Sequence, residues 1–397
     1  VTWCIVFFDQ VKVNEQLYKT VMKKPVFPVL CGLFILYAIL GCFGYGNDYD
    51  TYAMIKSGRD FFLTGHYHYS RGPGNFVPEM VIGGASLIGS FVLTNLISAL
   101  LGVGTLYLFW QLLIRKLSEQ ESLIIVMLLG FNPYFIIASS SSMDYIYGLF
   151  FAFAGITMLN KNNIFVASLL FAIAVSSRLT TISIIGLVYL YYLYIRFRAK
   201  DYKDITRFIF SGILTLILSV MFFVPSYYAA NCTFKFMEYG IGNWDLMGFL
   251  SRIIYKNIYL FGLIPFLFLG FMILWSFIKR KFSYPNTALV NTGMAIFIFM
   301  ELLFFKVPVE ISYLLPPLIV FLPMLVILFK PTVKQLYAFL ILTIIYSFIV
   351  NPDVLSKTYT ADKREAVSAE VGLFIRPGVI VDDVMNRDAS REFYWQD

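Results

Sequence analysis

The chain has 397 residues, of which 59% are hydrophobic and only 14% are charged, and it carries a net charge of +7. Soluble domains contain about 25% charged residues, and a globule of this length cannot hide so much apolar surface from water. These values exclude an ordinary soluble protein and predict a chain whose main solvent is a lipid bilayer.

Apolar runs of about 20 residues recur along the chain, and this pattern is typical of transmembrane helices. We therefore expect an all-α polytopic membrane protein with about 11 spans. The transmembrane domain covers residues 1–350, and a small C-terminal segment covers residues 351–397. The expected spans are 26–45, 85–114, 122–138, 145–160, 164–177, 180–195, 208–228, 258–278, 287–305, 313–329 and 336–350.

The distribution of basic residues predicts the orientation of the chain in the membrane. With the N-terminus inside, the inner segments hold more than half of the 31 lysines and arginines, as the positive-inside rule requires. The positive charge is therefore a topology signal, and nucleic acid is not an expected partner. This orientation places the loops 46–80 and 228–256 and the C-terminal segment outside the cytoplasm, in a multi-pass plasma-membrane protein.

The first outer loop, 46–80, is the longest polar stretch near the start of the chain. Asp48 and Asp50 stand one residue apart where the first span ends. Asn47 or Asp48 can cap a helix over 49–63, and Gly65 can end it. Its apolar and polar sides predict a helix lying in the membrane interface. The aspartates serve either as helix caps alone or as carboxylates at the mouth of an active site.

The same loop continues with two further patterns. His66 and His68 share one face of an extended segment, so they either bind a metal ion or pack at the interface. In the stretch 70–74, glycine and proline fix a turn beside Arg71, and an arginine held rigidly can bind a phosphate with paired donors. We expect the helix that follows to break at Gly83-Gly84.

Three later outer positions carry charges close to membrane depth. Asp144 follows a tight hairpin and either caps the next helix or faces the first loop. Arg178 and Lys306 either extend to lipid headgroups or bind a phosphate. In the loop 228–256, Glu238, Trp244 and Asp245 are candidate sugar contacts or part of an aromatic belt. In the C-terminal segment we expect a helix over 360–373 and a strand at 379–381.

These motifs together resemble the GT-C superfamily of integral-membrane glycosyltransferases, which includes protein O-mannosyltransferases and aminoarabinose transferases. The resemblance rests on Asp48 and Asp50 after the first span, and on the stretch YHYSRGPG at 67–74, which is similar to a Y-x-x-S-R-x-P-G pattern. Asp144 after a hairpin, Arg178 in an S-R-L-T setting and the stretch YLLP at 313–316 also match.

The resemblance implies that a sugar moves from a polyprenyl phosphate to a hydroxyl of a lipid, glycan or protein acceptor, with inversion, at the extracytoplasmic face. It implies a carboxylate base, for which Asp50 is the first candidate and Asp48 the second. A divalent cation, Mg²⁺ or Mn²⁺, and catalysis by side-chain cations alone are both compatible with it. The expected roles are catalysis by Asp50 and Asp48; phosphate binding by Arg71, Arg178 and Lys306; acceptor or sugar binding by Asp144, Tyr69, Glu79, Glu310 and Tyr313; and metal binding by Asp48, Asp50, His66 and His68.

Two other classes of function remain open from the sequence. A lipid or oligosaccharide flippase is expected to show internal repeats and ionisable groups in the middle of the membrane, whereas the charges here gather at the predicted outer ends. An outer-face polysaccharide polymerase or ligase is also polytopic, but it does not depend on an aspartate pair after the first span.

Overall fold

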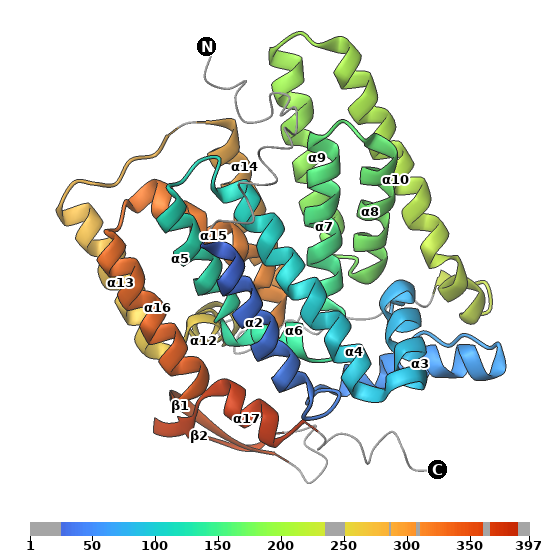
Figure 1. The fold of residues 1–397 in the computed structure, drawn as a ribbon, viewed down its shortest axis with the longest axis horizontal. Helices are drawn as coiled ribbons and strands as arrows, with labels where there is room; N and C mark the ends of the chain where they lie inside the picture. Colours follow the sequence, from blue (N-terminus) through green and yellow to red (C-terminus); the bar gives the residue numbers. More distant parts are fainter. Residues whose placement is uncertain (1–24, 235–250, 286, 307–309, 360–365, 388–397) are drawn as a thin grey trace.

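The computed structural model describes residues 25–234, 251–285, 287–306, 310–359 and 366–387. Within these residues it is a bundle of helices with one β-hairpin (Figure 1). The α-helices are α2 (Val26–Gly41), α3 (Tyr49–Thr64), α4 (Phe76–Leu113), α5 (Glu119–Gly130), α6 (Pro133–Ser140), α7 (Tyr145–Asn160), α8 (Ile164–Ser177), α9 (Thr181–Arg198), α10 (Tyr202–Ala229), α12 (Asn257–Phe261), α13 (Leu263–Ile278), α14 (Ala288–Lys306), α15 (Leu315–Phe329), α16 (Val333–Phe348) and α17 (Val379–Met385).

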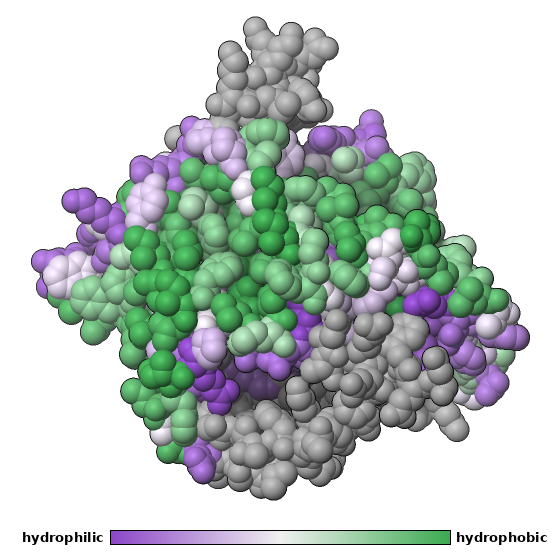
Figure 2. All heavy atoms as spheres, turned by 60° about the horizontal axis from the view of Figure 1, so that its bottom comes forward, coloured by the Kyte–Doolittle hydropathy of each residue, from purple (hydrophilic) through white to green (hydrophobic). Residues whose placement is uncertain are grey.

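The expected all-α polytopic fold is confirmed, whereas the number of spans stays a prediction. Four helices of the described part are long and apolar enough to cross a membrane: α4, α10, α14 and the segment 311–329. Two bent pairs, α5 with α6 and 254–261 with α13, pass as single spans, and four shorter apolar helices accompany them. Figure 2 shows the broad apolar flank that this composition gives the bundle.

Helix α4 is broken at a different place from the one predicted. Its backbone leaves helical geometry at Gly89 and Ser90, so the expected break at Gly83-Gly84 is wrong. Gly83 instead lies where α4 crosses α3, because a Cβ atom added there would come within 2.4 Å of the Gly58 backbone. The glycines are therefore needed for the close approach of two helices.

The predicted interfacial helix is present as α3, which lies across one end of the bundle (Figure 1). Asp48 caps it by accepting a hydrogen bond from the backbone N–H of Asp50 at 2.9 Å. Gly65 ends it in the left-handed conformation with φ of 75°. The turns between α4 and α5 and between α9 and α10, which carry many of the basic residues, lie at the opposite end.

The C-terminal segment folds differently from the prediction. Strand β1 (Val350–Tyr359) pairs with β2 (Ala366–Pro377) as an antiparallel hairpin, although a helix was expected over 360–373. The expected strand at 379–381 is the start of helix α17. Both predictions are wrong because a short segment with weak periodicity takes the structure that its neighbours allow. Here α17 packs against α6 and α16 at the same end of the bundle as α3.

Candidate active site

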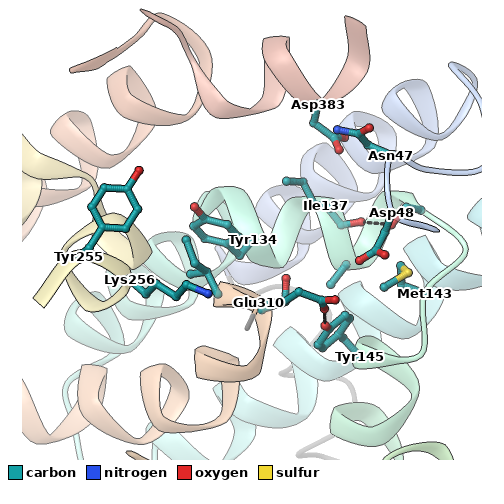
Figure 3. A pocket seen from close by; sticks show the side chains of 14 residues that line it. Asn47, Asp48, Tyr134, Ile137, Met143, Tyr145, Tyr255, Lys256, Glu310 and Asp383 are labelled. Carbon is teal, nitrogen blue, oxygen red and sulfur yellow. Dashed lines mark hydrogen bonds between the residues drawn. The ribbon is translucent and has the colours of Figure 1, made fainter. Parts of the chain in front are cut away.

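A cavity of about 420 Å³ opens at the end of the bundle where α3 lies. Figure 2 shows a hollow with hydrophilic side chains at this end, below the apolar flank. The cavity draws its lining from segments far apart in the chain, as Figure 3 shows. Its polar and aromatic lining residues are Asn47, Asp48, Ser141, Tyr134, Tyr145, Tyr255, Lys256, Glu310, Ser312 and Asp383.

Asp48 and Glu310 bring carboxylates into this cavity from opposite parts of the sequence (Figure 3). Asp48 is half-buried at the start of α3, and Glu310 directly precedes a 3-10 turn (Ile311–Leu314) that leads into α15. Glu310 accepts a hydrogen bond from the Tyr145 hydroxyl. The side chain of Lys256 extends towards Glu310 from the end of a π-helical segment (Ser251–Lys256). The cavity thus combines two carboxylates, an ammonium group and a phenol.

Beside the cavity, Asp144 organises a buried ionic network. Its carboxylate is 1% exposed and accepts from Arg71 Nη2 at 2.6 Å, from Arg178 Nη1 at 2.7 Å and from Asn75 Nδ2 at 2.8 Å. Arg71 also forms an ion pair with Asp50. Burying several charges is tolerated only when they are paired and hydrogen-bonded, as they are here. The network therefore joins the first loop to the start of α7 and the end of α8.

Arg178 is fixed by two aromatic rings as well as by its carboxylate partner. Its guanidinium group lies 3.7 Å from the ring centroid of Tyr145 and 4.1 Å from that of Tyr313, and the two rings meet edge to face. Such stacking stabilises a desolvated arginine. Tyr313, expected to bind sugar or acceptor, is thus placed beneath Arg178.

The carboxyl groups of the site differ in the direction in which their pKa values are shifted. Burial alone would raise the pKa of Asp144, but Arg178 and Arg71 outweigh it, so this pKa lies below its usual value. Burial raises the pKa of Asp48, and the negative charge of Asp144 adds to the rise. Burial also raises the pKa of Glu310 to about 8, with Asp48 adding to it. Asp144 is therefore a permanent anion, whereas Asp48 and Glu310 retain protons more readily than usual.

Carboxylate oxygens of Asp48, Asp50 and Glu310 lie within 4.8 Å of one another. Carboxylates are the ligands that Mg²⁺ and Mn²⁺ prefer, so this group fits a divalent cation. Glu310 was expected as a sugar or acceptor ligand, and the structure adds it to the predicted aspartate pair. His66 and His68 are exposed and do not belong to this group of described residues.

Glu79 does not line the cavity; its carboxylate accepts hydrogen bonds from residues of the first loop and so holds the loop in place. It is fully buried and accepts from the backbone N–H of Ser70 at 3.0 Å, from Ser57 Oγ at 3.1 Å and from the backbone N–H of Asn75 at 3.3 Å. Tyr67 donates to it as well. The expected contact of Glu79 with sugar or acceptor therefore does not fit this geometry. The carboxylate holds the turn that carries Arg71.

The remaining predicted residues take different positions. Tyr69 is half-buried in the same turn, with its Cβ atom close to Gly74. Lys306 is the last residue of α14, and its side chain lies outside the described part of the structure. The candidate sugar contacts Glu238, Trp244 and Asp245 also lie outside the described residues.

Several polar residues that line the cavity were not singled out from the sequence, namely Tyr134, Ser141, Tyr145, Tyr255, Lys256, Ser312 and Asp383. Lys256 carried a usable signal, because it stands at the predicted outer boundary of a span. The other residues gave no such signal, because tyrosine and serine are common throughout this chain and Asp383 lies in the C-terminal segment, for which no function was predicted.

The arrangement of helices resembles that of a protein of known structure. It matches the crystal structure of ArnT from Cupriavidus metallidurans in the apo state, with a TM-score of 0.50 and 15% sequence identity over 79% of this chain. Over the matched part, the chain shares the fold of ArnT. It spans 60% of the length of the ArnT chain. No family model matches the sequence, and no curated protein matches it significantly.

The shared fold agrees with the family resemblance that the loop motifs indicate. In the present chain, the carboxylates that carry the resemblance, Asp48, Asp50 and Asp144, meet at one end of the bundle.

Proposed function

We propose that this protein is a GT-C-type glycosyltransferase that moves a sugar from a polyprenyl-phosphate donor to an acceptor hydroxyl at the extracytoplasmic membrane face. The observation that carries the proposal is the position of Asp48 in a hydrophilic cavity at the end of an apolar bundle, opposite Glu310 and Lys256. A lipid-linked donor suits this place, because its prenyl chain can remain in the bilayer while its phosphate reaches the cavity.

Asp48 is a better candidate for the general base than Asp50. Both were proposed from the sequence, with Asp50 first, but the Asp50 carboxylate is engaged by Arg71. Asp48 lines the cavity, and burial raises its pKa, which strengthens it as a proton acceptor. We therefore assign proton abstraction to Asp48 and assign to Asp50 the placement of Arg71.

The proposed reaction is a direct displacement at the anomeric carbon. Asp48 takes the proton of the acceptor hydroxyl, the acceptor oxygen forms a bond to the anomeric carbon, and the bond from that carbon to the phosphate oxygen breaks. The electron pair leaves with polyprenyl phosphate. Attack from the face opposite the leaving group inverts the anomeric configuration.

The charge that develops on the leaving phosphate needs fixed cations nearby. Arg71, Arg178 and Lys306 were predicted for this role, and the first two lie at the site but are shared with Asp144 and Asp50. Lys256 extends into the cavity from another segment. We propose that Lys256 contributes to phosphate binding together with the arginines, whose orientation Asp144 and the aromatic rings fix.

A divalent cation fits the same carboxylates. Asp48, Asp50 and Glu310 would hold it, and when bound it would supply positive charge to the phosphate. The protein groups would still orient the acceptor and accept its proton. The position of these ionisable groups at the end of the bundle, rather than in its middle, favours an enzyme over a transporter.

The direct test is turnover of a polyprenyl-phosphate sugar by the purified protein in lipid nanodiscs. Replacing Asp48 by Asn removes the base, so turnover should fall by about 10²- to 10⁴-fold. Asp60→Asn, on the same helix, is the matched control and should keep wild-type turnover. An outer-face polymerase would tolerate Asp48→Asn and Asp50→Asn, and wild-type turnover in both variants would refute the proposal.

A further inference from the structure

Arg387, in the turn that follows α17, is a buried charge that the proposed reaction does not use. It is 1% exposed, and its guanidinium group reaches two other helices. Nη1 donates to the backbone carbonyls of Leu40 at 2.6 Å and Ser140 at 2.7 Å, and Nη2 donates to Ser140 Oγ at 2.7 Å. Nε is paired with Asp383 at 2.9 Å. One side chain therefore binds the ends of α2 and α6.

These contacts have a clear physical cause. The last carbonyls of a helix have no partner within the helix, and the C-terminal end carries a partial negative charge. Leu40 and Ser140 lie in the last turns of α2 and α6. An arginine can satisfy such carbonyls and compensate both helix ends at once. Hydrogen bonds from a charged donor are among the stronger ones, so the contact fixes the two ends relative to each other.

The two helix ends are also the starting points of the segments that carry Asp48, the proposed base, and Asp144, the centre of the ionic network. The chain runs from α2 through residues 42–47 to Asp48, and from α6 through residues 141–143 to Asp144. The two segments are joined by a hydrogen bond from the Ser142 N–H to the Tyr45 carbonyl at 2.8 Å. On the other side, Tyr52 of α3 donates to the backbone carbonyl of Arg387 at 3.3 Å. Arg387 thus contacts the helix ends from which both segments start, and it also contacts α3.

We propose that Arg387 is a positioning residue that sets the distance between Asp48 and Asp144. The C-terminal segment then contributes to the activity of the site through this residue. The inference rests on the proposed function for the catalytic meaning of these carboxylates. Asp383 supports it, because the partner of Arg387 itself lines the cavity beside Asn47 and Asp48 (Figure 3). A substrate in the cavity would therefore lie against the C-terminal segment.

The first test measures amide hydrogen exchange in the full-length protein in nanodiscs. Arg387→Lys keeps the positive charge but cannot donate to both carbonyls and to Ser140 Oγ at once. We expect the protected amides of residues 42–43 and 142–143 to exchange about tenfold faster, as the loss of a charged hydrogen bond implies. The turn at residues 199–201 should not change. Arg376→Lys, which alters the pair of Arg376 with Asp353 in the same C-terminal segment, is the control and should exchange like wild type.

The second test is kinetic and separates positioning from a merely structural role. Misplacement of a base lowers the rate of the bound complex, so kcat should fall about 10- to 100-fold while KM stays within about twofold. Unchanged exchange in both segments, a uniform increase across the bundle, or local loosening without loss of kcat would each overturn the inference. If the wild-type protein turns over no polyprenyl-phosphate sugar, the proposed function fails, while the exchange measurement still decides whether Arg387 fixes the two segments.

Discussion

The Tyr145 hydroxyl donates a hydrogen bond to the carboxylate of Glu310, which lies 165 residues further along the chain. The ring of the same tyrosine lies under the guanidinium group of Arg178 at 3.7 Å. Tyr145 therefore connects the carboxylates of the cavity with the buried network around Asp144. A change on one side of this residue should therefore alter the geometry on the other side.

The stability of the protein should depend on pH through Glu310. Burial raises its pKa from 4.5 to about 8 in the folded protein, so the folded state binds a proton that the unfolded state has already released. Stability is therefore fully present below about pH 4.5 and is lost as the pH rises through about 8. We expect the Tm in the presence of a chelator to fall between pH 6 and pH 9. Glu310→Gln should flatten this slope, and an equally steep slope in that variant would contradict the assignment.

A divalent cation should stabilise the protein through the three clustered carboxylates. At a concentration 100-fold above the dissociation constant, Mn²⁺ should raise the free energy of unfolding by about 3 kcal/mol. Thermal unfolding with and without Mn²⁺ measures this effect. Asp48→Asn and Glu310→Gln should each abolish the shift, whereas replacement of both His66 and His68 by alanine should leave it intact. If the stabilisation by Mn²⁺ disappears only in the histidine variant, the metal ion binds at His66 and His68 and not at the carboxylates.

Removing Arg178 should destabilise the folded protein strongly. Arg178→Ala leaves the buried Asp144 with one guanidinium partner fewer and takes the cation from the rings of Tyr145 and Tyr313. Breaking one side of a buried ion pair costs about 3–5 kcal/mol. Arg207→Ala is the control, because Arg207 is 49% exposed and pairs with Asp204 at 3.4 Å, where about 0–1 kcal/mol is expected. Equal losses in chemical unfolding of the two variants would argue against the buried network.

Glu79→Gln should loosen the first loop while keeping the shape of the side chain. The amide keeps one oxygen for the backbone N–H groups of Ser70 and Asn75, which donate to the same carboxylate oxygen. It replaces the other oxygen by an NH2 group, so the hydrogen bonds that the Ser57 and Tyr67 hydroxyls donate to Glu79 would be lost at a cost of about 1–3 kcal/mol. Limited proteolysis within residues 65–75 should become faster. Glu119→Gln, in the exposed first turn of α5, should leave the cleavage rate unchanged. A stable, protease-resistant Glu79→Gln variant would show that the loop is held by other contacts.

Outside the C-terminal segment, the sequence determined which parts of the chain are helical and which are polar. The predicted bounds 145–160 and 164–177 match α7 and α8, and the predicted caps of α3 are confirmed at Asp48 and Gly65. Length and apolar composition are sufficient for this, because a segment in a bilayer must satisfy its backbone hydrogen bonds internally. The local signals of capping and glycine termination act within a few residues and can be read from the chain alone.

Only the tertiary structure decided which charged groups meet. Asp50 and Asp48 are nearly equivalent in the sequence, but packing engages the first with Arg71 and leaves the second in the cavity. The contact of Arg387 with α2 and α6 and the fold of the C-terminal segment were likewise beyond local patterns. These outcomes depend on contacts between segments separated by tens to hundreds of residues, whose energies are set by burial and geometry and not by neighbouring sequence.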